Sequence, residues 1–312
     1  MNTEVLWTAL EITLPVFLLV LTGIVLHWRK LIDDAFIAVS SKLVFSLALP
    51  VLMFRAVATA DMDFFAHTGF VLFALTAAAL SVLLVLIWAK LAGIRPSQEG
   101  SFIQAGFRSN LGIVGLALCI AAYGDQGAAL GALLLAVVTP LYNIASVWLL
   151  NRQHAPDWRR QFASVVRNPL ILAIFIAAPF QLFHWPLPAV VLHTGNLLAQ
   201  LALPLALIGV GGSLNVHLKH SAEPRVLQIV LLKLVLVPVL TILLAWYAGF
   251  RMEELGVLAL MFASPTAAAS FVMAKAMGGD ALLTARAIAM TTLGSLFSVS
   301  GILYILAQLP LV

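Results

Sequence analysis

Two groups of polar residues interrupt long apolar stretches of the sequence, and their side chains have chemistry that suits ligand binding. The first group is Arg108-Ser109-Asn110, followed by Gly112 and Gly115, and the second is Ser264-Pro265-Thr266, followed by Ser270. Proline removes a backbone donor and clashes with the preceding helical turn, while Ser, Thr and Asn side chains bond the freed backbone groups. Each group therefore predicts a break in a helix, at Gly112 and Gly115 in the first and at Pro265 in the second.

Two broken helices of this kind predict an anion-binding site. The half-helices that begin near Gly112 and Thr266 would aim their N-terminal amides, and the positive ends of their dipoles, at one central point. Such helix N-termini bind carboxylates and phosphates. The alternative is a pair of ordinary packing kinks, since Gly and Pro are common in membrane helices. The equivalent placement of both breaks in an internal repeat favours the site.

Positive charge inside the apolar stretches supports the same prediction. Arg108 and Lys275 flank the two breaks, Lys42 and Lys233 lie in other apolar stretches, and no Asp or Glu lies in the central part of any stretch. A charge in the middle of a bilayer costs about 2.5–3.5 kcal/mol on insertion scales and marks a functional site by default. The lysines have an alternative role, because their long side chains can reach a membrane interface. The pattern favours a ligand with a carboxylate.

Tyr142 and Asn143 are further candidates, because they follow Thr139 and Pro140 in an otherwise apolar stretch. Their polar groups either bind a substrate or satisfy the carbonyls that Pro140 frees, and the sequence leaves both open. The seven histidines lie in loops or at the ends of apolar stretches, and Cys119 is the single cysteine, so we expect neither a metal nor a cofactor. The predicted substrate-binding residues are Arg108, Ser109, Asn110, Gly112, Tyr142, Asn143, Ser264, Pro265, Thr266, Ser270 and Lys275.

The elements that position these residues are predicted to be membrane helices. Of the 312 residues, 62% are apolar and 10% are charged, and the mean hydropathy is +1.07. Soluble domains are roughly half apolar and a quarter charged, and a membrane helix needs roughly 20 apolar residues. Ten such runs are present, at 6–26, 35–57, 68–91, 100–123, 127–150, 168–185, 188–213, 225–248, 254–277 and 283–308. We predict an all-α membrane protein with ten transmembrane helices and no nucleic-acid-binding domain.

Basic residues between these runs predict the orientation, because cytoplasmic loops carry an excess of Lys and Arg. With both termini on the outer side, eleven of the 17 Lys and Arg fall on the cytoplasmic side, and Arg55 and Arg251 fall on the other. The eleven are Arg29, Lys30, Lys90, Arg95, Arg152, Arg159, Arg160, Arg167, Lys219, Arg225 and Arg286. We expect a bacterial inner-membrane protein with both termini on the periplasmic side.

The second half of the chain repeats the first at a shift of about 155 residues. Leu47-Ala48-Leu49-Pro50 recurs as Leu201-Ala202-Leu203-Pro204, Phe107 and Ser109 match Phe262 and Ser264, and Gly124-Asp125 recurs as Gly279-Asp280. Because each copy has five helices, an odd number, the copies enter the membrane from opposite sides, as the inverted repeats of secondary transporters do. We predict a first repeat over 1–150, a cytoplasmic linker over 151–167, a second repeat over 168–312, and further hinges at Pro50 and Pro204.

With these residues the chain resembles the auxin efflux carrier family, which includes plant auxin exporters and bacterial permeases for malonate and malate. The specific part of the resemblance is 107–116 with Ser264-Pro265-Thr266, Lys275 and Gly279-Asp280, supported by 47–50 and 233–238. It implies a scaffold of the first, second, sixth and seventh helices, a mobile transport bundle of the other six, and a homodimer. It also implies that the fourth and ninth helices unwind and cross at the substrate site. One departure is Ala117, where plant members have a proline.

These observations predict a secondary transporter of a small mono- or dicarboxylate. Efflux is the favoured direction, because an anion gains energy on leaving a cell that is negative inside. The alternative is a membrane-embedded sensor that binds the carboxylate without moving it. An enzyme would need a nucleophile and a base at depth, and only Ser270 with Lys275 offers such a pair. The expected partners are the anion, the lipid bilayer and a second copy of the chain; the sequence identifies neither the substrate nor a coupling ion.

Overall fold

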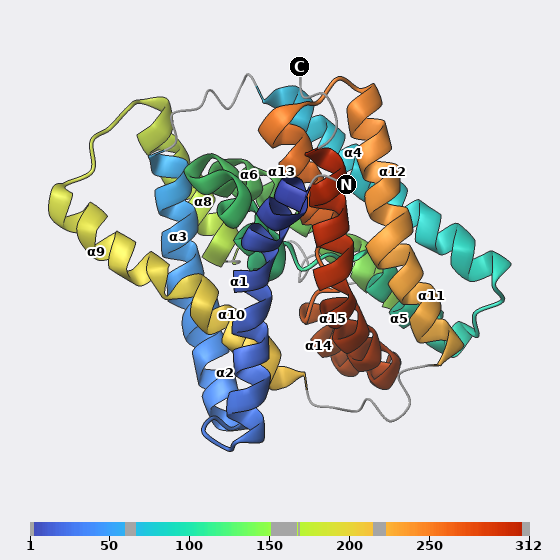
Figure 1. Ribbon diagram of the computed structural model, residues 1–312. Helices are drawn as coiled ribbons and strands as arrows, with labels where there is room; N and C mark the ends of the chain where they lie inside the picture. Colours follow the sequence, from blue (N-terminus) through green and yellow to red (C-terminus); the bar gives the residue numbers. More distant parts are fainter. Residues whose placement is uncertain (1–2, 60–66, 151–166, 168, 215–222, 308–312) are drawn as a thin grey trace.

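The computed structural model describes residues 3–59, 67–150, 167, 169–214 and 223–307, and these residues form helices and one isolated bridge (Figure 1). Seven helical stretches in this part of the chain are long and apolar enough to cross a membrane. The prediction of an all-helical, multi-pass membrane protein is thereby confirmed. The number of ten crossing helices remains a prediction, because the helices within 96–107 and 252–276 are short and 111–150 counts as one stretch.

The first half of the chain forms six α-helices and two wide, π-helical turns. Nearly all of the predicted linker over 151–167 lies outside the described residues. The elements are α1 (Thr3–Trp28), α2 (Asp34–Leu43), η1 (Val44–Ala48), α3 (Leu49–Ala58), α4 (Thr68–Leu91), α5 (Pro96–Phe107), η2 (Leu111–Gly115) and α6 (Leu116–Leu150).

The second half forms eight α-helices and one π-helical turn among its described residues. They are α8 (Pro169–Leu182), α9 (Ala189–Gln200), α10 (Ala202–Ser213), α11 (Pro224–Leu231), η4 (Leu232–Leu236), α12 (Val237–Tyr247), α13 (Met252–Ala263), α14 (Ala269–Ala276) and α15 (Ala281–Leu306).

Prolines account for two of the π-helical turns. η1 comes directly before the helix turn that holds Pro50, and η4 comes directly before the turn that holds Pro238. A proline has no N–H to donate to the carbonyl four residues earlier, so the turn before it can widen without losing a further hydrogen bond. Pro204, the other predicted hinge, lies near the start of α10, just after a turn at Leu201 separates α9 from α10.

Gly124 divides α6 into two helices that form a tight hairpin. Its φ of 56° and ψ of −136° are not helical, and positive φ favours glycine because it lacks a Cβ. The two arms then pack closely: a Cβ added at Gly127 would lie 2.1 Å from the carbonyl oxygen of Cys119. This hairpin lies at the boundary that the sequence predicts between the runs 100–123 and 127–150.

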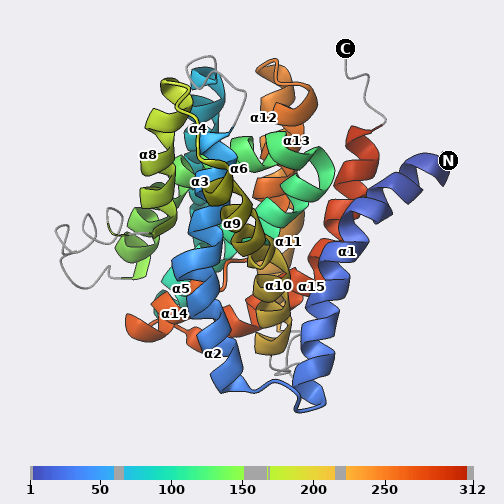
Figure 2. The ribbon, with the colours of Figure 1, turned by 90° about the vertical axis from the view of Figure 1, so that its left-hand side faces the viewer.

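The helices pack as two groups. One group, which we call the first packing group, consists of α1, α2, α3, α8, α9 and α10; the second packing group consists of α4, α5, α6 and α11 to α15. Contacts of α1 with α15 and of α3 with α6 join them. Figure 2, turned from the view of Figure 1, shows α9 and α10 crossing in front of the second group. The start of α1 and the end of α15 lie at the same end of the molecule (Figure 1).

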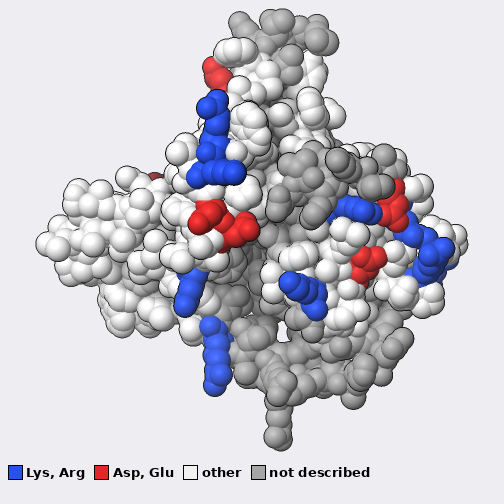
Figure 3. All heavy atoms as spheres, turned by 90° about the horizontal axis from the view of Figure 1, so that it is seen from below, with Lys and Arg blue, Asp and Glu red and all other residues white. Residues whose placement is uncertain are grey.

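The outer surface matches a lipid environment. Large apolar side chains point outward from both packing groups; for example, Phe175 of α8 is 70% exposed and Phe297 of α15 is 78% exposed. Charged side chains gather instead at the ends of the helices. Figure 3 shows Lys and Arg, with some Asp and Glu, spread over the end of the molecule where α1 turns into α2. Arg29 and Lys30 belong to that turn and are exposed.

Candidate functional site

The two predicted break regions lie side by side in the folded chain. Residues 108–110, between α5 and η2, and residues 264–268, between α13 and α14, are not helical. Ser109 and Thr266 form an antiparallel bridge. The N–H of Asn110 donates to the carbonyl of Pro265 at 2.8 Å, and the N–H of Ala267 donates to the carbonyl of Arg108 at 2.9 Å. We call these paired segments the first interruption and the second interruption.

Hydroxyl side chains satisfy carbonyls at the ends of the helices that enter the interruptions. Thr266 Oγ1 donates to the carbonyl of Ala105 in α5 at 2.7 Å, which links the second interruption to the helix of the first. Ser264 Oγ donates to the carbonyl of Met261 at 2.7 Å, within its own helix end. The last carbonyls of a helix have no helical donor. These serine and threonine side chains therefore let two helices end among buried residues without leaving those carbonyls unpaired.

Arg108 is buried and points from the first interruption towards α6. Its guanidinium donates to the carbonyl of Tyr142 at 3.2 Å, to Ser146 Oγ at 2.9 Å and to Asn143 Oδ1 at 2.6 Å. The structure thus brings together three predicted site residues, Arg108, Tyr142 and Asn143. In this structure the side-chain amide oxygen of Asn143 accepts a hydrogen bond from the Arg108 guanidinium. The ring of Tyr142 packs on the ring of Phe107 at a centroid distance of 5.2 Å.

Lys233 also lies at the paired interruptions, although the sequence reasoning did not include it among the candidate site residues. It lies in η4, is 0% exposed, and its Nζ donates to Ser109 Oγ at 2.6 Å and to the carbonyl of Phe262 at 2.7 Å. Interface anchoring, the alternative role considered for this lysine, is wrong. Its position near the middle of the run 225–248 was the available signal, because a side chain at that depth does not reach either interface.

The break predicted at Gly112 and Gly115 lies earlier in the chain, at residues 108–110, and both glycines belong to the π-helical turn η2. They permit η2 to approach its neighbours closely. A Cβ added at Gly115 would lie 2.8 Å from Met261 Sδ and 3.3 Å from Ser264 Oγ, both in or beside α13. A Cβ added at Gly112 would lie 3.2 Å from a methyl group of Leu135. Larger residues at Gly115 would push the first interruption away from the second.

Two predicted site residues of α14 have different surroundings. Ser270 is fully buried, and its Oγ has no hydrogen-bond partner among the described residues. Lys275 is exposed in the last turn of α14, and the structure does not bring it to the paired interruptions. Lys42, in α2, is also exposed. Of the three lysines Lys42, Lys233 and Lys275, only Lys233 is buried.

Two buried basic side chains lie at the paired interruptions. Arg108 and Lys233 are buried, and none of the Asp and Glu residues whose burial the structure describes is buried. The hydrogen-bond acceptors of both cations described above are neutral carbonyl, amide and hydroxyl oxygens. Within the same described ranges no cluster of His, Cys, Asp or Glu suits a metal ion. A buried cation with only neutral partners favours a negatively charged ligand.

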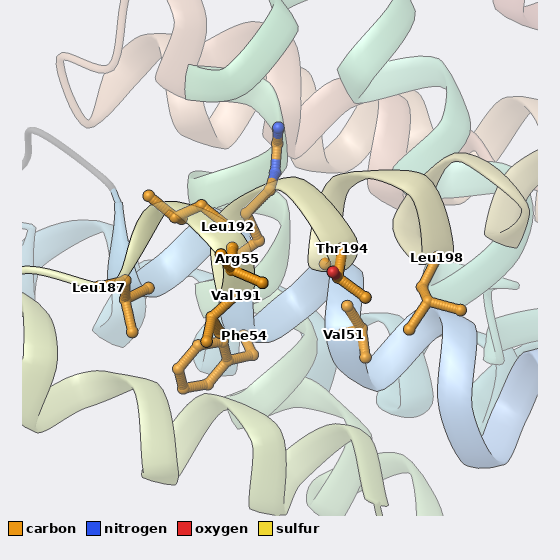
Figure 4. Close-up of a pocket in the computed structure, with 10 residues that line it drawn as sticks. Val51, Phe54, Arg55, Leu187, Val191, Leu192, Thr194 and Leu198 are labelled. Carbon is orange, nitrogen blue, oxygen red and sulfur yellow. The ribbon is translucent and has the colours of Figure 1, made fainter.

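Two cavities lie beside Arg55 of α3. A cavity of about 360 Å³ lies between the packing groups and is lined by Pro15, Leu52, Ala117, Asn196, Gln200 and Pro204, among others. A second cavity, of about 380 Å³, lies between α3 and α9 and is almost entirely apolar. Figure 4 shows Arg55 extending away from Phe54 in this second cavity. The Arg55 guanidinium donates to Asn196 Oδ1 at 3.0 Å and pairs with Asp125, which follows the Gly124 turn.

Comparison with known proteins gives the class of the protein. A family model described as "Membrane transport protein" matches residues 8–156 and 157–303. The chain is 25% identical over 293 residues to an "Uncharacterized transporter" of Methanothermobacter thermautotrophicus, covering 92% of this chain and 95% of that protein. It is 29% identical over 276 residues to a "Putative malonate transporter" of Rhizobium meliloti, covering 83% and 84%. The chain belongs to this membrane transport protein family, which confirms the resemblance to the auxin efflux carriers.

Proposed function

We propose that this protein is a secondary transporter of a small organic anion with one or two carboxylates, bound at the paired interruptions. The observation that carries the proposal is the presence of two buried cations, Arg108 and Lys233, at the paired interruptions, with no buried acid among the residues whose burial the structure describes. The name of the Rhizobium relative supports malonate as a first compound to test. The proposed substrate-binding residues are those predicted from the sequence on both interruptions and α6, with Gly112 of η2 and the buried Ser270 of α14; Lys233 holds Ser109 in place.

We further propose that the chain crosses the membrane ten times as two inverted repeats of five helices. In this arrangement α5 with η2 and the first arm of α6 form one broken helix, and α13 with α14 forms the other. The sequence repeat at a shift of about 155 residues supports this. So does the antiparallel bridge between Ser109 and Thr266, because it pairs one break from each half of the chain.

Alternating access would then be a movement of the second packing group, as the transport bundle, against the first as the scaffold. The cavity of about 360 Å³ supports this division, because Leu52 of α3 and Ala117 of α6 line it from opposite groups. The scaffold would also form a homodimer. Excess Lys and Arg at the ends opposite the chain termini support an inner-membrane location with both termini on the periplasmic side.

Export is the proposed direction. Each negative charge that leaves a cell polarised at 100 mV, inside negative, gains about 2.3 kcal/mol, which drives efflux without a partner ion. Glu11, the acid nearest to a possible proton-carrying position in the sequence, is exposed in α1. Export driven by the membrane potential alone does not require a proton-carrying acid.

Flux of labelled malonate in proteoliposomes tests the proposed function. A transporter moves the labelled malonate across the membrane. A sensor binds malonate, which is detected as a shift in the melting temperature of the purified protein, but produces no flux.

The proposed movement is tested in a Cys119→Ala background with Leu52→Cys and Ala117→Cys. A bifunctional thiol reagent that joins these positions should stop flux and leave binding intact; single-cysteine variants treated in the same way are the control. Undiminished flux in the joined protein would rule the movement out.

A further inference from the structure

Lys233 occupies a place where a transporter that is coupled to a cation gradient would bind that cation. Its Nζ lies 2.7 Å from the carbonyl oxygen of Phe262 and 2.6 Å from Ser109 Oγ. Phe262 is the penultimate residue of α13, so its carbonyl lies at the negative end of the helix dipole. The C-terminal ends of half-helices in secondary transporters coordinate Na⁺ or a proton through such carbonyls. Here a lysine ammonium fills that position.

The fold holds this ammonium in place from a third element. Lys233 belongs to η4, which joins α11 to α12 along the chain, packs on α5, α13 and α15, and is not part of either interruption. Its neighbours Leu232 and Leu234 are buried, and Lys233 itself has no exposed surface. π-helical turns occur frequently at functional sites, because the wide turn redirects a side chain. The side chain of Lys233 thereby contacts Ser109 within the first interruption and the carbonyl of Phe262 in α13, the helix that leads into the second.

Among the side chains whose burial the structure describes, no carboxylate is available for a coupling cation. A proton- or sodium-coupled carrier usually keeps a carboxylate at depth, and none of these Asp and Glu residues is buried. Ser109 Oγ, which also approaches the carbonyl of Phe262 at 3.3 Å, is itself an acceptor for Lys233. The same two oxygens would be available to a small cation only if the ammonium were absent.

We propose, on the basis of the transport function proposed above, that Lys233 is a resident cation that takes the place of a coupling sodium ion. It acts as a positioning residue: its charge joins the carbonyl end of α13 to Ser109 and so holds the two interruptions together for the substrate. Transport by the natural protein then proceeds without sodium. Removal of the ammonium exposes the two oxygens, Phe262 O and Ser109 Oγ, to sodium from solution.

The test is uptake of labelled malonate by the full chain in proteoliposomes at a fixed membrane potential, with sodium or with N-methylglucamine. We expect equal uptake by the natural protein in both solutions. Lys233→Arg, which keeps the charge, should retain most of the uptake. Lys233→Ser should lose at least about tenfold without sodium, as expected for hydrogen bonds from a charged group, and should regain several-fold activity with sodium. Lys42→Ser, at the exposed lysine of α2, is the matched control and should behave as the natural protein.

Three results would overturn the inference. They are uptake by the natural protein that requires sodium, undiminished uptake by Lys233→Ser, and a folded Lys233→Ser that is equally inactive with and without sodium, which would make the role purely structural. If Lys233→Ser does not fold, sodium-dependent uptake by Lys233→Arg or by the natural protein overturns it equally. Failure of the transport function itself gives a different result, namely no uptake by the natural protein in either solution.

Discussion

The two interruptions have similar backbones and different side-chain surroundings. Each ends one helix, pairs with the other through a backbone hydrogen bond, and precedes a second helix. The first interruption holds Arg108, and its Ser109 accepts from Lys233. The second is held by neutral hydroxyl groups, since Ser264 and Thr266 each donate to a helix carbonyl. The two interruptions thus share a backbone arrangement, whereas Arg108 and the serine that accepts from Lys233 both belong to the first; on the side of the second, Lys233 bonds only the carbonyl of Phe262 in α13.

This difference predicts that substitutions of the first interruption affect anion binding most. The largest effect is expected for Arg108→Ala, which removes a buried charge and leaves the oxygens of Asn143 and Ser146 without their donor. Hydrogen bonds to charged groups contribute about 1.5–3 kcal/mol each, so affinity for malonate should fall by roughly 10- to 100-fold or more. Calorimetric titration of the purified protein measures this. Arg108→Lys tests geometry, because it keeps the charge without the planar fork of donors, and Arg29→Ala on the surface is the control.

A paired substitution of equivalent serines tests the comparison itself. Ser109→Ala removes an acceptor of the Lys233 ammonium, whereas Ser264→Ala removes a neutral bond within the end of α13. The expected losses in binding free energy are about 1.5–3 kcal/mol for the first and about 0.5–1.5 kcal/mol or less for the second. Equal losses in the same titration, or a larger loss for Ser264→Ala, would show that charge is not concentrated at the first interruption.

A smaller effect is expected for Asn110→Ala. The pairing of Asn110 with Pro265 uses its backbone N–H, which alanine retains. Only the side-chain amide is removed, so affinity for the carboxylate should fall by about 1 kcal/mol, the contribution of one buried hydrogen bond. Binding that is unchanged in Asn110→Ala, Arg108→Ala and Pro265→Ala alike would place the site elsewhere in the molecule.

The approximate positions of both interruptions could be predicted from the sequence, because polar residues and a proline act locally. Pro265 lies within the second interruption, whereas the first consists of residues 108–110 and lies just before Gly112 and Gly115, which belong to the π-helical turn η2. The partners of the charges could not be predicted in this way. Whether Lys233 reaches an interface or a carbonyl depends on how η4 and α12 pack on α13, which is tertiary packing between separate helices.

Lys275 is a second lysine whose surroundings could not be predicted from the sequence. Its spacing from Pro265 resembles that of a site residue, but the eight-residue helix α14 ends so that the lysine is exposed. The number of residues between a break and a side chain determines how far along the helix that side chain lies. It does not determine in which direction around the helix axis the side chain points when both of its sequence neighbours are apolar. The orientation of Arg108 towards Tyr142 and Asn143 was open for this reason, although all three residues were predicted to belong to the site.

The most direct test of the central claim is uptake of labelled malonate into proteoliposomes under an imposed potential, with sodium absent and equal pH on both sides. An anion carrier that uses only its resident cations should accumulate malonate when the interior is positive, lose it when the interior is negative, and do neither when Arg108 is replaced by alanine. Flux that ignores the potential and starts only when a sodium or pH gradient is applied would contradict the account.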